Sequence, residues 1–141
     1  MIKTGFIGEY EHSLDEKDRV SIPSKYKKYI EEITPDIDAR GRVVLVKGRE
    51  KCIEVFPAQD WGAMVASYNQ GMSLTDNGAK DDIRKKSRDA FEADIDRSGR
   101  IRVPSKLKEY AGLSKKVVMI GVIDRFEIWD EAALKEFDSK K

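Results

Sequence analysis

Two stretches of this chain repeat one pattern of residues, and the repeat limits the folds that the chain can adopt. Residues 14–25 read LDEKDRVSIPSK and residues 95–106 read IDRSGRIRVPSK, 81 positions later, with identical Asp, Arg, Pro, Ser and Lys positions. A second block matches at offsets of 74 and 73, where VVLV resembles VVMI and IEVF resembles FEIW. Each copy has roughly 45–55 residues, too few to bury a good core alone. The repeat therefore predicts two half-domains that share one core.

Apolar periodicity predicts the same order of elements in both copies: strand, turn, strand, helix, strand, turn, strand. Alternation over 91–95, 20–22 and 101–103 indicates strands. Helices are expected to start at Pro23 and Pro104, within the first helical turn, and to end near Ile30 and at Ala111-Gly112. Further strands are expected at 43–46, 53–56, 117–120 and 126–129, and helices at 60–68 and 76–87. The fold class is thus α+β, with the mixed-charge tail 138–141 frayed.

The positive charge of the chain is concentrated in the repeated segments. Residues 17–28 carry +4 and residues 97–108 carry +5, while the whole chain carries +1, which leaves −8 for the rest. A single charge run is commonly a solvated helix face. Because the run recurs at matching positions, we interpret both copies as parts of a surface that attracts a polyanion.

The turn between the first two strands of each copy contains Asp-x-x-x-Arg, as Asp15 to Arg19 and Asp96 to Arg100. An Asp at this place accepts backbone N–H groups and organises the loop, and Gly99 permits a positive φ. The arginine fork can then hold phosphate oxygens, or O6 and N7 of guanine. Alternatively, Asp and Arg simply pair, which would contribute about 0–1 kcal/mol. Further candidate DNA contacts are Lys17, Arg97, Lys25, Lys106 and Arg102.

Several classes of protein are disfavoured by the sequence. The longest apolar run, residues 117–123, is far shorter than the roughly 20 residues that cross a bilayer. The lone Cys52 cannot form an internal disulfide, so we expect an intracellular protein. One His and one Cys cannot furnish a zinc site without carboxylates, and nucleotide-binding glycine motifs are missing. We therefore expect no metal, no cofactor, no small-molecule substrate and no membrane partner.

The chain resembles the MraZ family, over nearly its whole length, in a set of motifs that are specific in combination. They are 11–15 (EHSLD), 19–25 (RVSIPSK), 96–100 (DRSGR) with Pro104, 109–113 (EYAGL) and 124–129 (DRFEIW). The resemblance implies two AbrB-like swapped-hairpin halves that form a double-split β-barrel with flanking helices. It places the first half at 1–72, a helical connector at 73–90 and the second half at 91–141.

The resemblance also implies a function. Proteins of this family are bacterial transcription regulators of the cytoplasm and nucleoid that assemble into homo-oligomeric rings. They bind short G-rich direct repeats in double-stranded DNA, upstream of the division and cell-wall gene cluster. Arg19 and Arg100 would be the principal contacts, with Asp15 and Asp96 holding the loops. One departure is Asp18, where the family usually has Gly. A carboxylate beside Arg19 would weaken phosphate binding by the first loop.

Two other functions stay open at this stage. A ring-forming scaffold could use the same basic loops to bind an acidic protein partner. A small hydrolase could use His12, the only histidine, with neighbouring carboxylates. Because no Ser or Cys stands near His12 in a matching pattern, a structural role for this histidine is favoured and a non-enzyme is expected.

Overall fold

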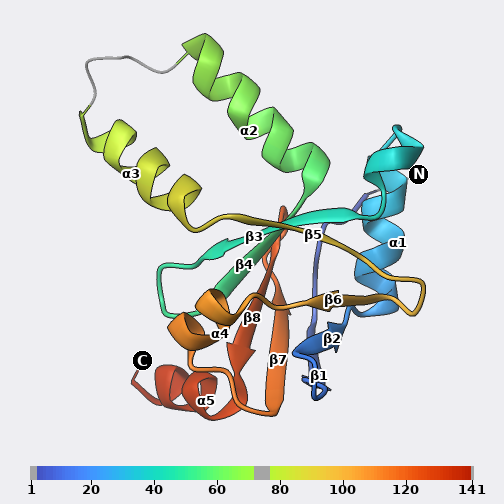
Figure 1. Cartoon of the computed structure of the whole chain (residues 1–141), viewed down its shortest axis with the longest axis vertical. Coiled ribbons are helices and arrows are strands. Elements are labelled where there is room, and N and C mark those ends of the chain that lie inside the picture. The colour runs from blue at the N-terminus through green and yellow to red at the C-terminus, as the bar shows by residue number, and fades with distance from the viewer. Residues whose placement is uncertain (1–2, 72–76, 141) are drawn as a thin grey trace.

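The computed structural model describes residues 3–71 and 77–140, which form an α+β fold (Figure 1). The strands are β1 (Glu9–Ser13), β2 (Arg19–Ser21), β3 (Arg42–Lys47), β4 (Ile53–Pro57), β5 (Phe91–Asp94), β6 (Arg100–Arg102), β7 (Lys116–Gly121) and β8 (Phe126–Asp130). The helices are α1 (Ser24–Ile33), the short η1 (Ile37–Ala39), α2 (Ala58–Gly71), α3 (Asn77–Arg88), α4 (Ser105–Ala111) and α5 (Glu131–Ser139). The predicted order of strands and helices in each repeat is confirmed.

The strands of the two repeats are shared between two sheets. In the larger sheet the order is β1-β7-β8-β4-β3-β5, so that β1 of the first repeat pairs with β7 of the second and β5 pairs with β3. β4 and β8 meet at the centre, and β2 pairs with β6 in a two-stranded ribbon. All of these pairings are antiparallel. Neither repeat therefore completes its sheet without strands of the other.

The helices that follow the repeated prolines start one residue later than predicted, and only α4 ends where predicted. Pro23 and Pro104 are N-cap residues, one position before the helix rather than inside its first turn. α4 ends where Gly112 adopts a left-handed φ of 62°. α1 has no glycine there and continues to Ile33, beyond the predicted end. It stops at Thr34, which is extended and precedes Pro35, and whose hydroxyl donates to the Ile30 carbonyl at 2.6 Å.

The C-terminal helix α5 was not predicted, and the expectation of a frayed tail from residue 138 is wrong for 138 and 139, which are helical. Asp130 caps the helix by accepting the Ala133 N–H at 3.1 Å, and the Phe137 ring packs 5.0 Å from that of Trp129. An Asp followed by Glu131 is a recognisable helix start. The apolar periodicity that would have predicted the helix is weak, because the helix has only nine residues.

The main core is built from both repeats. Phe6 lies at its centre with ring contacts to Tyr26, Tyr29 and Phe126 at 5.3, 4.9 and 5.4 Å. Beneath the ribbon, the paired Val20 and Ile101 are essentially inaccessible to solvent, and matched residues of both repeats complete the same cluster: Ile22, Val103, Leu107, Val43, Val55, Val117 and Ile128. The shared core expected from the repeat is therefore confirmed.

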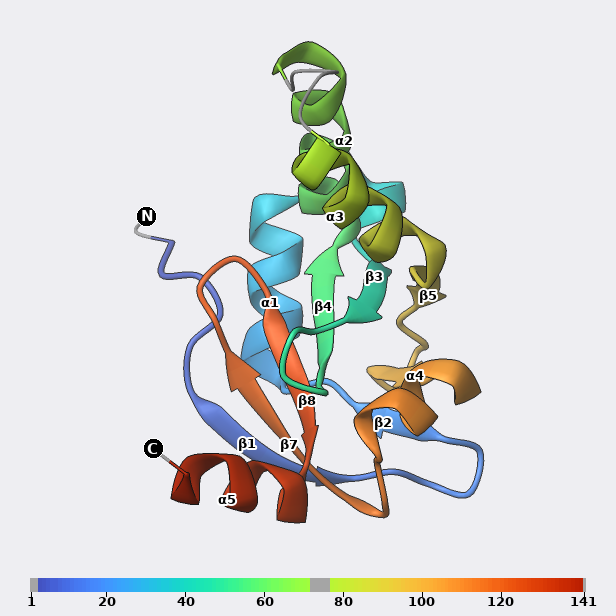
Figure 2. The ribbon, with the colours of Figure 1, turned by 90° about the vertical axis from the view of Figure 1, so that its left-hand side faces the viewer.

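α2 and α3 stand together at one end of the molecule, away from the β1–β2 connection (Figure 2). Both helices overlap the segments predicted at 60–68 and 76–87, although residue 76 lies outside the described residues. The boundary expected between 72 and 73 also lies outside them. Within the described ranges, no helix combines the length and apolar composition that crossing a bilayer requires.

Ile101→Ala should lower the free energy of unfolding by about 2–5 kcal/mol, since it leaves a cavity beneath the ribbon. The matched control is Arg102→Ala on the same strand, whose side chain is exposed, with an expected change within about 0.5 kcal/mol. Urea unfolding followed by circular dichroism measures both values. Equal effects would contradict the assignment of Ile101 to the core.

Candidate nucleic-acid interface

The two-stranded ribbon places three arginines on one surface. In the register of β2 and β6, Arg19 lies opposite Arg102, Val20 opposite Ile101 and Ser21 opposite Arg100. Side chains alternate across a strand, so the buried Val20 and Ile101 point inward while the three arginines share the outer face. Arg19 comes from the first repeat, and the other two come from the second.

Both Asp-x-x-x-Arg turns have the same hydrogen-bond geometry. Asp15 Oδ1 accepts the N–H groups of Lys17 and Arg19 at 2.8 and 2.9 Å. Asp96 Oδ1 accepts those of Ser98 and Arg100, both at 2.9 Å. The expected loop-organising geometry of the two aspartates is therefore present in both repeats.

Each turn is also fixed by a residue with positive φ and by the opposite repeat. Asp18 and Gly99 have φ values of 59° and 79° at equivalent positions. The Val103 N–H donates to the Asp18 carbonyl and the Ile22 N–H donates to the Gly99 carbonyl, both at 2.8 Å. Because these bonds cross between the repeats, the two turns and the ribbon form one unit.

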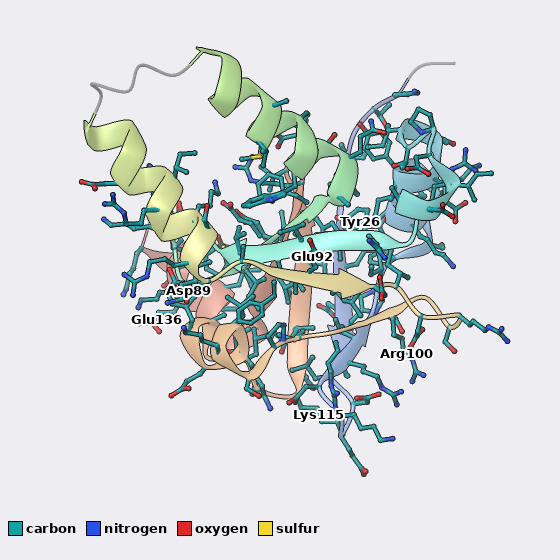
Figure 3. The ribbon with its side chains drawn as sticks, turned by 45° about the horizontal axis from the view of Figure 1, so that its top comes forward. Tyr26, Asp89, Glu92, Arg100, Lys115 and Glu136 are labelled. Atoms are coloured by element: carbon teal, nitrogen blue, oxygen red, sulfur yellow. The ribbon has the colours of Figure 1, made fainter. Side chains whose placement is uncertain are left out.

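The aspartates also pair with the arginines, so the alternative interpretation of the motif holds at the same time. Arg19 Nε lies 2.8 Å from Asp15 Oδ2, while Arg100 Nε lies 3.4 Å from Asp96 Oδ2 and its Nη1 lies 3.5 Å from Asp15 Oδ2. The side chains of Arg19 and Arg100 remain 32% and 31% exposed. Figure 3 shows Arg100 on the side of the molecule away from α2 and α3. Both arginines thus lie at the surface and not in the interior.

The carboxylates of the turns are held in their charged form. The backbone N–H of Arg19, followed by that of Lys17 and by the Arg19 side chain, lowers the pKa of Asp15. In the same way the backbone N–H of Arg100, then that of Ser98, lowers the pKa of Asp96. At neutral pH each turn therefore presents an ionised Asp beside a charged Arg.

The other residues predicted to contact DNA differ in their surroundings. Lys17, Arg97, Lys25 and Arg102 are exposed, and Arg102 Nε donates to the Lys17 carbonyl at 3.3 Å. Lys106 is exposed too, but its Nζ lies 2.8 Å from Asp89, at the end of α3. Its salt bridge therefore ties Lys106 to α3 and not to the turns.

Sequence reasoning missed one interaction at the interface. Lys108 Nζ donates to Asp18 Oδ1 at 2.7 Å, so the Asp18 carboxylate pairs with α4 of the second repeat and not with Arg19. The two residues are 90 positions apart, and no local pattern in the sequence joins them.

The residues considered for catalysis or metal binding do not form a site. His12 lies on β1 opposite Val117, and partial burial lowers its pKa. Cys52 is fully buried, and burial raises the pKa of its thiol, so the reactive thiolate is suppressed. Among the described side chains, no three metal-ligating residues gather.

A polar cavity of about 1010 Å³ lies between α3 and the β3–β4 turn. Some of its charged residues pair with one another: Lys47 with Asp89 at 3.1 Å, Lys86 with Glu54 at 3.6 Å, and Arg125 with Glu54 at 3.5 Å.

Comparison with known proteins gives a consistent assignment. A family model described as "MraZ protein, putative antitoxin-like" matches residues 6–84 and 87–141. The protein named "Transcriptional regulator MraZ" from Acetivibrio thermocellus is 35% identical over 94% of this chain and 85% of its own length. Namesakes from Lactiplantibacillus plantarum (33%, over 96% and 89%) and Natranaerobius thermophilus (37%, over 89% and 81%) are similar. On the strength of these matches along both repeats, the chain belongs to the MraZ family of transcriptional regulators.

Proposed function

We propose that this protein is a sequence-specific regulator that binds double-stranded DNA with the outer face of the β2–β6 ribbon and its two turns. One observation carries the proposal: arginines of both repeats gather on one face of a two-stranded antiparallel ribbon. The major groove of B-DNA admits such a ribbon, and arginine forks can read guanine there or grip phosphates beside it.

The charge arrangement of the ribbon supports a polyanionic ligand. Arg19 and Arg102 lie directly opposite each other, and like charges at paired positions destabilise a sheet. Asp15 offsets only part of this repulsion, since it pairs with Arg19 and Arg100. Local destabilisation by such repulsion is typical of functional sites, and an approaching phosphate or guanine would relieve it.

In the proposed mechanism the aspartates orient the arginines and do not themselves touch DNA. Asp15 binds Arg19 through Nε, which leaves the terminal nitrogens available to a ligand. Asp96 and Asp15 hold Arg100 from two sides. A planar fork that is already positioned loses less conformational entropy on binding than a free side chain.

The finer architecture belongs to the same proposal. The two repeats, 1–72 and 91–141 with a connector at 73–90, would be AbrB-like swapped-hairpin halves of a double-split β-barrel with flanking helices. The exchanged pairings of β1 with β7 and of β5 with β3, and the ribbon of β2 with β6, support this description.

The proposed target is a set of short G-rich direct repeats upstream of the division and cell-wall gene cluster, bound in the cytoplasm at the nucleoid. One ribbon offers few base contacts, so specificity would come from a ring of identical subunits on spaced repeats. Linking the ribbons raises the effective concentration of each for its own repeat.

Arg100→Ala should weaken binding to a fluorescent duplex with tandem G-rich repeats by more than tenfold, or about 1.4 kcal/mol. The reason is the loss of an oriented contact in every subunit. Fluorescence anisotropy measures the affinity, and size-exclusion chromatography checks the assembly. Lys135→Ala on α5 is the matched control and should bind like the unaltered protein. Unchanged binding by Arg100→Ala would refute the role of the turns.

Selection of bound sequences from random duplexes should enrich spaced G-rich direct repeats. With those duplexes, the logarithm of the binding constant should fall with the logarithm of salt concentration by about 0.9 for each phosphate neutralised. A scaffold for an acidic protein would enrich no sequence, and that outcome would favour the protein partner over DNA.

A further inference from the structure

The two turns of the interface differ in charge at one matched position. Asp18 and Gly99 are equivalent by the repeat and share a positive φ, but only Asp18 has a side chain. Its carboxylate accepts a hydrogen bond from Lys108 Nζ at 2.7 Å, with the two side chains 31% and 38% exposed. The ammonium group of Lys108 is therefore neutralised at the edge of the proposed DNA-binding face.

The repeat identifies the counterpart of Lys108 as Lys27, 81 positions earlier. The Lys27 N–H donates to the Pro23 carbonyl and the Lys108 N–H donates to the Pro104 carbonyl, at 3.1 and 2.9 Å, so both stand at the same place in their helices. The crossed bonds, Ile22 to Gly99 and Val103 to Asp18, hold the start of each helix beside the turn of the other repeat.

Lys27 therefore lies beside the Gly99 turn as Lys108 lies beside the Asp18 turn, but it meets no carboxylate there. In the part of the chain that the structure describes, the Lys27 ammonium group has no ion-pair partner. One end of the ribbon thus carries a free cation where the other end carries a neutral pair.

We propose that Lys27 binds a DNA phosphate while Asp18 masks Lys108, so that the two ends of the ribbon bind the duplex backbone with unequal strength. The inference rests on the proposed function and adds to it the orientation of each subunit along the duplex. The two strands of a duplex present equivalent phosphates in opposite directions, so a ribbon with equal ends would have little electrostatic reason to prefer one orientation. Unequal ends set the orientation, which subunits on direct repeats must share.

Binding of the same tandem-repeat duplex to four variants tests the proposal. Lys27→Met should weaken binding about threefold to fivefold, the effect of one exposed charge contact, and should reduce the salt slope by about 0.9 per bound subunit. Lys108→Met leaves the Asp18 carboxylate without its cation, so it should weaken binding by repulsion of the DNA and not by loss of a phosphate contact. Asp18→Gly, which suits the positive φ of residue 18, should strengthen binding and steepen the slope by the same amounts. Combining Asp18→Gly with Lys108→Met should abolish that gain.

Amine labelling without DNA tests the masking separately. In the full-length protein, an N-hydroxysuccinimide ester followed by peptide mass spectrometry should modify Lys27 faster than Lys108. Asp18→Gly should raise the labelling rate of Lys108 to that of Lys27, because the carboxylate that holds its ammonium group is gone.

The outcomes separate this inference from the proposed function. If Arg100→Ala weakens binding but Lys27→Met does not, or if Asp18→Gly has no effect, the unequal ends are refuted and the DNA-binding ribbon stands. Equal labelling of the two lysines before Asp18 is replaced refutes the masking. If the unaltered protein and Arg100→Ala bind every duplex equally, both proposals fail together.

Discussion

The hydrogen bonds that cross between the two repeats are the constraint on which the interface depends. Val103 donates to Asp18 and Ile22 donates to Gly99, so neither turn can move without the strand and helix of the other repeat. The pairing of Val20 with Ile101 closes the ribbon over the core. Arginines that would be mobile on isolated hairpins are thereby held on one surface. Their positive potentials therefore sum over that surface.

Much of the fold was predictable because the repeat supplied the same signal twice. The order of strands and helices followed from alternation around Val20, Ile22, Ile101 and Val103 and from the prolines that precede α1 and α4. The short α5 was missed because a helix of nine residues leaves little periodic signal. The end of α1 was also misplaced, since no glycine ends it: the helix stops at the extended Thr34, which precedes Pro35.

The candidate site was predictable to the level of the motif but not of its charge balance. Sequence spacing indicated that Asp15 and Asp96 accept backbone N–H groups, and the structure contains those bonds. It could not show that Asp15 contacts arginines of both repeats, or that Asp18 pairs with Lys108. These contacts join residues far apart in the chain, and only the tertiary pairing of β2 with β6 brings them together.

The exchange of strands between the repeats has a consequence for folding during synthesis on the ribosome. β1 finds its sheet partner only in β7, more than a hundred positions later in the chain. The first repeat therefore emerges with an open strand edge and an incomplete core, and it must wait for most of the second to be translated. Contacts of such long sequence separation slow folding and expose unpaired edges to neighbouring chains. Nascent chains of this protein would thus depend on protection from premature association until translation is nearly finished.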